Sequence, residues 1–218
     1  MQIVDELMKV ALLGSAWVLY LLFALSVVSL AAVIERVVFF AKNARGAQGL
    51  DDALPAVLLH DGPRAAGEFL RGYPSVEARV LISAIAYADG GRDAVRDALE
   101  SALARERPLL ERGSTLLGTL GNNAPFVGLF GTVIGVVEAF HHLGDGSDAA
   151  MESVMAGIAE ALIATGVGIF VAIPAVVAFN WVQKRVAEIE HRAAGLGALV
   201  CASLGAHRLS GTSASGER

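Results

Sequence analysis

Uncharged stretches long enough to cross a membrane dominate the pattern of hydrophobic and polar positions along the chain. Residues 10–34 and 113–137 contain no charged residue, and residues 153–183 contain only Glu160. An α-helix rises about 1.5 Å per residue, so about 20 apolar residues cross a hydrocarbon core of roughly 30 Å. Each stretch is therefore predicted to be a transmembrane helix. The first is too long for a cleaved signal peptide, and its basic flank follows it instead of preceding it.

The segments outside these stretches are predicted to be helical as well. Turns that contain glycine and proline divide the region after the first span into short helices at 50–59, 64–70 and 76–88. No stop signal is evident between residue 92 and the second span, so one uninterrupted helix is expected over 92–140. A second long helix is expected to continue from the third span towards residue 204, because the apolar spacing stays helical.

The positions of the basic residues predict the orientation in the membrane. Of 17 lysines and arginines, only Lys9 precedes the first span, and residues 141–152 contain none. Basic residues that flank short segments are retained in the cytoplasm. Residues 36–112 and 184–218 are therefore expected in the cytoplasm, with the N-terminus and the 141–152 hairpin outside.

The predicted fold class is all-α, an integral membrane protein with three transmembrane helices, two of them long and extending into a cytoplasmic helical domain. The expected segments are a short outer N-terminus (1–9), transmembrane helix 1 (10–42), a cytoplasmic helical region (43–112), transmembrane helix 2 (113–140), an outer hairpin (141–152), transmembrane helix 3 (153–183), a cytoplasmic C-terminal helix (184–209) and a disordered tail (210–218). The tail is assigned from its serine- and glycine-rich composition.

Composition narrows the class of function. The 218 residues are 55% hydrophobic and 18% charged, with a mean hydropathy of +0.57, well above that of a soluble globular domain. The net charge of −5 argues against nucleic acid as a partner. The sequence contains no P-loop, no HExxH motif and no Ser/His pairing at matched depth, so we do not expect an enzyme. The single cysteine and the adjacent His141 and His142 predict no metal site or cofactor.

Small residues distinguish the second and third spans from the first, which has the composition of a helix facing lipid. They recur at helical spacing in two stripes, Pro125, Gly128, Thr132, Gly135 and Ala139 in the second span and Ala161, Thr165, Gly168 and Ala172 in the third. Small residues allow close helix approach, and tight packing alone explains any single glycine. Thr132 and Thr165 are expected about 14 Å and about 16 Å below the outer boundary. Their hydroxyls could bond to backbone carbonyls of their own helices, or form a polar ring in a narrow lumen lined by several copies.

Glu160 is the only ionisable residue well inside the apolar core of a span. Charged residues at such depth are costly and face a bundle interior or a hydrated cavity. Two roles are open for Glu160. It could form an interhelical hydrogen bond to a neighbour such as Asn122 or Asn123, or act as a proton-accessible carboxylate.

Two long motifs resemble a known family. The stretch GNNAPFVGLFGTVIG at 121–135, followed by GIAEALIATGVGIFVAIPA at 157–175, is similar to the paired signature of the ExbB/TolQ/MotA proton-channel family. The likeness covers the second and third spans closely and the layout of three spans generally. Residues 46–107 match the family only in length and helicity.

The resemblance implies a homopentamer in the bacterial inner membrane, with a lumen between its second and third helices. Two copies of a single-span partner of the ExbD/TolR type would occupy that lumen and supply the proton-carrying aspartate. Thr132 and Thr165 would face this aspartate, and Glu160 matches the glutamate of the family's third span. The small residues of the stripes would pack around the lumen, namely Pro125, Gly128, Gly135, Ala161, Gly168 and Ala172.

The function that the resemblance implies is a proton-channel stator subunit that couples the proton motive force to mechanical work. The alternative is a non-conducting membrane scaffold subunit, for which the same glycines suffice. Ile134 stands where many ExbB and TolQ chains carry tryptophan, and Glu138 where a neutral polar residue is frequent. MotA itself has four spans. The sequence therefore leaves TonB-type transport, Tol-type envelope maintenance and gliding motility open.

Overall fold

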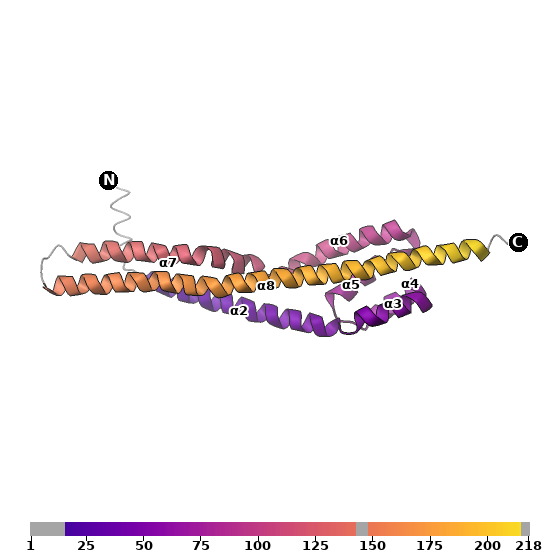
Figure 1. Cartoon of the computed structure of the whole chain (residues 1–218), viewed down its shortest axis with the longest axis horizontal. Helices are drawn as coiled ribbons and strands as arrows, with labels where there is room; N and C mark the ends of the chain where they lie inside the picture. The colour runs from indigo at the N-terminus through magenta and orange to yellow at the C-terminus, as the bar shows by residue number, and fades with distance from the viewer. Residues whose placement is uncertain (1–15, 143–147, 215–218) are drawn as a thin grey trace. The chain divides into compact units, whose positions relative to one another are not determined.

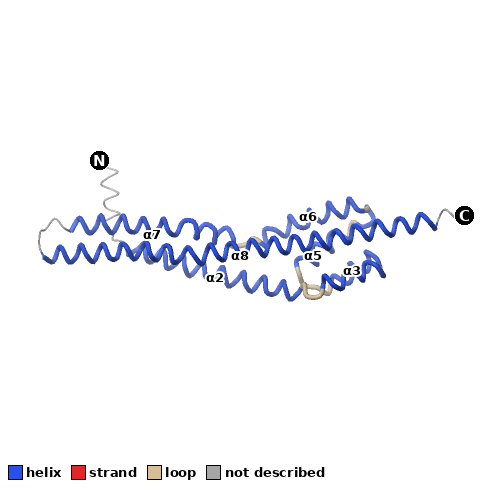
Figure 2. The backbone as a smooth tube through the Cα atoms, in the orientation of Figure 1, coloured by secondary structure: helices blue, strands red, loops and turns tan. Residues whose placement is uncertain are grey.

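A computed structural model describes residues 16–142 and 148–214 of the chain (Figure 1). Its elements in chain order are α2 (Ala16–Gly46), α3 (Leu50–His60), α4 (Gly62–Leu70), α5 (Val76–Ile85), the 3-10 helix η1 (Ala88–Gly90), α6 (Arg92–Leu110), α7 (Ser114–His142) and α8 (Asp148–Ala214). Within the described ranges the backbone forms no strand (Figure 2). Three helices, α2, α7 and α8, contain stretches long and apolar enough to cross a membrane. The predicted all-α class with three spans is confirmed.

The chain divides into two compact units. The membrane unit comprises the described parts of Met1–Glu35 and Gly113–Trp181, and the second unit comprises those of Arg36–Arg112 and Val182–Arg218. Both α2 and α8 contribute residues to each unit. The long helices that continue beyond a span are therefore α2 and α8.

The predicted uninterrupted helix over 92–140 is wrong. Helix α6 ends at Leu110 and α7 begins at Ser114. Between them Gly113 has φ +74°, a left-handed conformation that glycine adopts without steric cost, and its carbonyl accepts the Leu117 N–H at the start of α7. The sequence carried a signal for this end, because Gly113 directly follows the basic Arg112.

The other short helices lie close to their predicted positions, and the C-terminal helix is longer than expected. Helices α3, α4 and α5 begin within two residues of positions 50, 64 and 76. Helix α8 includes 210–214, the start of the tail expected to be disordered, because extending an existing helix costs less than nucleating a new one. The remaining parts of the expected terminal segments and hairpin, 1–9, 143–147 and 215–218, lie outside the described residues.

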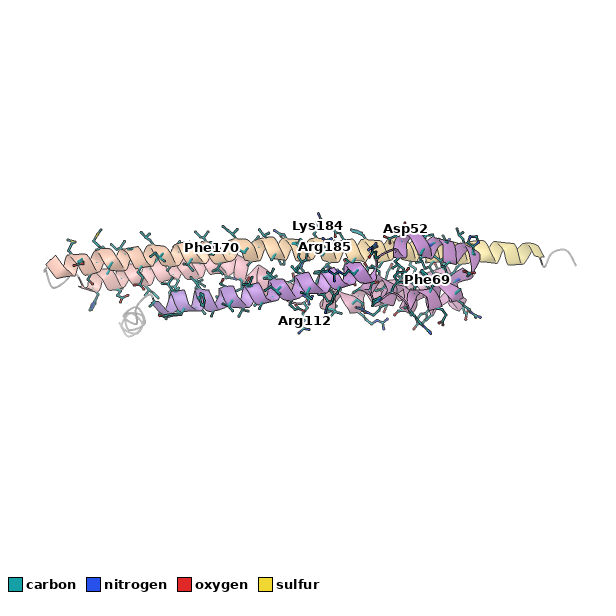
Figure 3. All side chains as sticks on the ribbon, turned by 90° about the horizontal axis from the view of Figure 1, so that it is seen from below. Asp52, Phe69, Arg112, Phe170, Lys184 and Arg185 are labelled. Atoms are coloured by element: carbon teal, nitrogen blue, oxygen red, sulfur yellow. The ribbon has the colours of Figure 1, made fainter. Side chains whose placement is uncertain are left out.

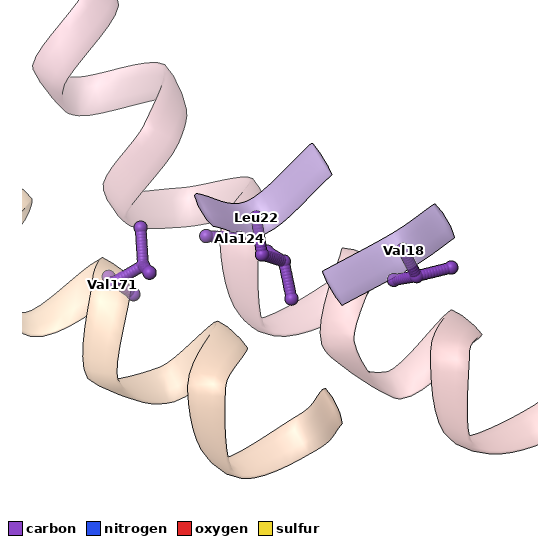
Figure 4. Close-up of a cluster of buried hydrophobic side chains, with 5 residues drawn as sticks. Val18, Leu22, Ala124 and Val171 are labelled. Atoms are coloured by element: carbon purple, nitrogen blue, oxygen red, sulfur yellow. The ribbon is translucent and has the colours of Figure 1, made fainter. Parts of the chain in front are cut away.

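An apolar cluster holds the membrane unit together. Val18 and Leu22 of α2 pack against Ala124 of α7 and against Val171 and Ala172 of α8 (Figure 4). Val18 and Leu22 are fully buried, at 0% exposure. The first span therefore packs against both other spans along one face.

Large apolar side chains cover the outside of the membrane unit. Phe170 of α8 is 75% exposed and projects away from the neighbouring helices (Figure 3). Tyr20 and Phe23 of α2 are exposed to a similar degree. An exposed aromatic surface of this kind suits contact with lipid instead of water.

A polar network that is buried at Asn43 and Glu77 and exposed at Asp51 links four helices of the second unit. Glu77 at the start of α5 is 1% exposed, and the Asn43 side-chain amide of α2 donates to its carboxylate at 3.0 Å. The Asn43 oxygen accepts from the Val76 backbone N–H at 2.8 Å. Arg192 Nη1 of α8 lies 3.8 Å from Glu77 Oε1, and Arg192 Nε donates to the Asp51 carboxylate of α3 at 2.8 Å. Hydrogen bonding to Asp51 raises the pKa of Arg192, so this guanidinium stays charged.

Arg36 closes the end of α6. Its side chain is buried, and Nη1 donates to the carbonyls of Leu109 at 3.0 Å and Leu110 at 3.4 Å. The guanidinium also lies 4.7 Å from the centre of the Phe39 ring. A cation at the C-terminus of a helix satisfies its last carbonyls and interacts favourably with the helix dipole. The sequence identified Arg36 only as a basic flank of the first span.

Substituting Gly113→Ala tests the break between α6 and α7. An added Cβ meets no atom within 4 Å, so the expected cost arises from the left-handed backbone alone. We expect the free energy of unfolding to fall by about 1–2 kcal/mol. The measurement is denaturant unfolding of the detergent-solubilised protein, followed by circular dichroism.

The matched control is Gly195→Ala in α8, which also has open space around the added Cβ but lies in regular helix. Alanine there should raise stability by up to about 1 kcal/mol, through its higher helix propensity. Equal effects of the two substitutions would contradict the assigned role of Gly113.

Substituting Asn43→Leu tests the buried network. The Val76 N–H and the Glu77 carboxylate would both lose a partner in a buried site. The free energy of unfolding is expected to fall by about 1–3 kcal/mol, measured by the same denaturant titration. The control Gln48→Leu removes an exposed amide and should change stability by less than about 0.5 kcal/mol. A neutral result for Asn43→Leu would mean that the network contributes nothing to stability.

Candidate functional site

Helices α7 and α8 pack against each other as an antiparallel pair along a continuous line of small residues, here called the seam. A Cβ added to Gly128 of α7 would lie 2.7 Å from the Ala164 carbonyl oxygen, and one added to Gly168 of α8 would lie 2.7 Å from the Ala124 carbonyl oxygen. Such distances leave no room for a side chain, so the two backbones are in direct contact. Towards one end of the pair Gly157 meets Ala139, with a distance of 3.1 Å between the added Cβ and the alanine Cβ.

The small residues predicted to pack around a lumen are found in and beside this seam. Pro125 is partly buried, and the rest of the set is buried within the single chain, namely Gly128, Gly135, Ala161, Gly168 and Ala172. Ala172 belongs to the apolar cluster with Val18. Close packing within one chain therefore accounts for the burial of these positions, and their relation to a lumen stays a prediction.

The structure brings the hydroxyls of Thr132 and Thr165 together across the seam. The two oxygens are hydrogen-bonded to each other, and either hydroxyl can donate. Thr165 Oγ1 also lies 3.1 Å from the Gly128 carbonyl oxygen. Thr132 Oγ1 lies 3.2 Å from the same carbonyl and 3.3 Å from that of Ala161. Both threonines are only partly buried, so one edge of the pair stays accessible from outside the chain.

This hydroxyl cluster holds more acceptors than donors. Its two hydroxyls supply one hydrogen each, and these serve both hydroxyl oxygens and the two carbonyl oxygens nearby. When one threonine donates to the other, the second can donate to only one carbonyl. The cluster can therefore accept a hydrogen bond from a further donor, such as water or a protonated carboxyl group.

Glu160 of α8 is partly buried, one residue from the Ala161 carbonyl that faces Thr132. The predicted partners Asn122 and Asn123 are exposed, and the Asn123 amide donates to a carbonyl of its own helix at 2.8 Å. Asn123 precedes Thr132 by nine residues, a rise of about 14 Å along α7. The hydrogen bond between Glu160 and these asparagines, one of the two roles left open for Glu160, is therefore not formed within a single chain.

Sequence reasoning missed two parts of the site. The bond from Thr132 to the Gly128 carbonyl of its own helix is one of the alternatives that the sequence left open, but the carbonyl contacts across the seam, Thr132 to Ala161 and Thr165 to Gly128, were missed. Val18 of α2 packs 3.0 Å from the position of a Cβ on Gly131, whereas the first span was expected to face lipid. In the part of the chain that the structure describes, no group of three or more His, Cys, Asp or Glu side chains could hold a metal ion.

Comparison with known proteins agrees with this architecture. A family model described as the MotA/TolQ/ExbB proton channel family matches residues 73–194, more than half of the chain. The Tol-Pal system protein TolQ of Pseudomonas aeruginosa is 46% identical over 97 residues, which cover 44% of this chain and 42% of that protein. The biopolymer transport protein ExbB of Xanthomonas campestris pv. campestris is 49% identical over 87 residues, 40% of this chain and 34% of that protein.

A longer match extends the likeness beyond the two motifs. The biopolymer transport protein ExbB of Neisseria gonorrhoeae is 34% identical over 148 residues, which cover 66% of each chain. The chain spans less than half the length of the TolQ and ExbB relatives with the higher identities. The stronger likeness is thus concentrated in a limited segment of each protein.

Substituting Gly168→Ala tests the backbone contact in the seam. The added methyl would lie 2.7 Å from the Ala124 carbonyl oxygen, so α7 and α8 must separate to admit it. We expect the free energy of unfolding in detergent to fall by about 1–3 kcal/mol. The readout is thermal or denaturant unfolding of the purified protein.

Gly166→Ala provides a matched control two residues away in the same helix. Its added Cβ meets nothing within 4 Å, so stability should stay unchanged or rise slightly. If both alanines destabilise the protein equally, the seam is not held by close backbone contact.

Proposed function

Because the chain belongs to the MotA/TolQ/ExbB proton channel family, we propose that it is a proton-channel stator subunit of an ExbB/TolQ-like inner-membrane motor. In this proposal it couples the proton motive force to mechanical work through a single-span partner of the ExbD/TolR type. The uses that stay open are TonB-type transport, Tol-type envelope maintenance and gliding motility.

The observation that carries the proposal is the hydroxyl cluster of Thr132 and Thr165. It is a partly exposed polar site between two apolar helices, and it has spare acceptor capacity. A protonated carboxyl group is a hydrogen-bond donor, whereas a carboxylate is acceptor-only. The cluster would therefore favour an acidic residue of the partner in its protonated form, which is the form that carries a proton across the membrane.

The assembly is proposed to be a homopentamer with the partner dimer on its axis. Thr132 and Thr165 would present their exposed edge to the lumen, and Pro125 would lie on the same side of α7. Glu160 would contribute a carboxylate near the level of the threonines, where a partly buried position in a span suits a hydrated cavity. The buried members of the stripes would keep α7 and α8 close enough for this edge to form.

The energy released by protons that cross the membrane is sufficient to drive mechanical steps of such a motor. Moving one charge through 100 mV yields about 2.3 kcal/mol, roughly four times the thermal energy RT. A few protons per step therefore exceed thermal noise. Hydroxyls suit a site that a partner carboxyl group must bind and leave at each step, because a neutral hydrogen bond contributes only about 1 kcal/mol net.

The proposed orientation has the second unit in the cytoplasm and the hairpin after α7 outside. Its support is the distribution of basic residues, which are absent from 141–152 and frequent in the second unit.

The alternative is a membrane scaffold that packs tightly and conducts nothing. The burial of Gly128, Gly168 and Ala161 in the seam favours this class, because helix packing alone explains these residues. Proton flux in liposomes that hold the chain together with its co-purified partner separates the two functions.

Substitution of the two threonines by valine tests the proton pathway. Thr132→Val and Thr165→Val keep the side-chain shape and remove a hydroxyl from the cluster. We expect each to reduce proton flux by about tenfold, the effect of losing roughly one hydrogen bond of about 1.4 kcal/mol. A pH-sensitive dye inside the liposomes reports the flux.

Thr119→Val is the matched control. The Thr119 hydroxyl is exposed in α7 and donates to the Thr115 carbonyl of its own helix at 2.8 Å, away from the cluster. Its loss should leave the flux unchanged. Wild-type flux in both cluster variants, with the partner present, would reject the pathway and leave the scaffold.

A further inference from the structure

The second unit carries an open cavity of about 740 Å³ where the end of α2 meets the turn before α5. Its lining residues are Lys42, Arg45, Gly46, Gln48, Gly72, Tyr73 and Pro74. No aspartate or glutamate is among them. The cavity therefore offers two cations and further hydrogen-bond donors to a ligand, and no competing carboxylate.

The two cations of this cavity are uncompensated. Across the described residues, the side chains of Lys42 and Arg45 form no ion pair and no hydrogen bond. Arg71, in the same unit, differs from them because it pairs with Glu68 at 3.1 Å. Two uncompensated charges on one wall create a positive potential that attracts anions.

The cavity also lies at the end of an apolar stripe on α2. Val38 is exposed and precedes Lys42 by four residues and Arg45 by seven, so all three share one face of the helix. In the sequence the same spacing runs back through Ile34 and Leu30 into the predicted span. The Cα atoms of Lys42 and Arg45 lie about 6 Å and about 10 Å beyond Val38 along the helix. For a hydrocarbon edge at Val38, within the predicted span 10–42, the polar layer beyond the edge is about 5–7 Å thick and lies within reach of both long side chains.

The chemistry of the lining suits a phosphate group. A guanidinium presents a planar pair of N–H donors to phosphate oxygens, and an ammonium adds a compact charge. The Gln48 amide and the Tyr73 hydroxyl can donate as well. The Tyr73 ring packs on Phe69 with 5.1 Å between ring centres, and tyrosine is a usual residue at a membrane–water interface.

We propose that this cavity binds the phosphate group of an anionic membrane lipid. Lys42 and Arg45 contact the phosphate, Gln48 and Tyr73 contact the rest of the headgroup, and the acyl chains extend from it along the apolar stripe of α2. This site is separate from the hydroxyl cluster and requires neither proton flux nor a partner protein.

The test measures lipid binding by the purified full-length protein in detergent. Native mass spectrometry and a fluorescence titration compare phosphatidylglycerol with zwitterionic phosphatidylcholine. The wild-type protein should retain phosphatidylglycerol selectively. Lys42→Gln together with Arg45→Gln should weaken phosphatidylglycerol binding by about thirtyfold, the combined effect expected for two basic residues at a membrane surface.

The matched control replaces Arg92 and Arg105 by glutamine, which removes the same charge at two exposed positions outside this cavity. The side chains of both residues, like the cavity pair, form no ion pair within the described part of the chain. This variant should bind within about twofold of wild type. An equal loss in both double variants would overturn the proposal in favour of general charge attraction.

Two further results would overturn the proposal. One is equal binding of phosphatidylglycerol and phosphatidylcholine by the wild-type protein, which does not depend on how any variant folds. The other is full displacement of the lipid by millimolar inorganic phosphate, which would assign the cavity to a soluble phosphate. Failure of lipid binding would leave the proton-flux measurements unaffected.

Discussion

Direct backbone contact between α7 and α8 is the constraint on which the membrane unit depends. Lipid chains are as apolar as leucine, so helices in a membrane associate through close packing and hydrogen bonds, with little help from the hydrophobic effect. Gly128 and Gly168 allow that packing because each faces a carbonyl of the other helix. The hydroxyls of Thr132 and Thr165 meet only because the helices are this close. The hydroxyl cluster of the spans thus depends on the two glycines that let the helices approach.

The second unit is organised by buried charge. Glu77 reaches Asn43 and Arg192, and Arg36 reaches the last carbonyls of α6, so each of these ionic groups has a polar partner. Leaving a buried ionic group unpaired would cost several kcal/mol in a low-dielectric interior, on the order of the whole stability margin of a small domain. These contacts join α2, α5, α6 and α8, and apolar packing fills the space between them.

The features that could be predicted from the sequence are those that depend on neighbouring residues along the chain. The spans were evident because a charge is costly in hydrocarbon, and the short helices were evident from glycine and proline at their ends. The break at Gly113 was missed, although Arg112 and Gly113 together are a helix-ending signal. Three-dimensional partners could not be predicted. Gly166 and Gly168 look alike in sequence, yet only Gly168 meets another backbone, and a small-residue stripe looks the same whether it lines a seam or a lumen.

Helix continuity has a mechanical consequence. Helix α8 runs from Asp148 to Ala214 as one helix that lacks a backbone hydrogen bond at Pro174, whereas the path through α6 and α7 is broken at Gly113. A single helix still resists torsion more than a glycine between two helices, where the backbone can rotate freely. A twist applied to the spanning part of α8 would thus be delivered to its far end, and a twist applied to α7 would be absorbed at the glycine. Rotation of the third span would therefore reach the second unit through α8, whereas rotation of the second span would not reach α6.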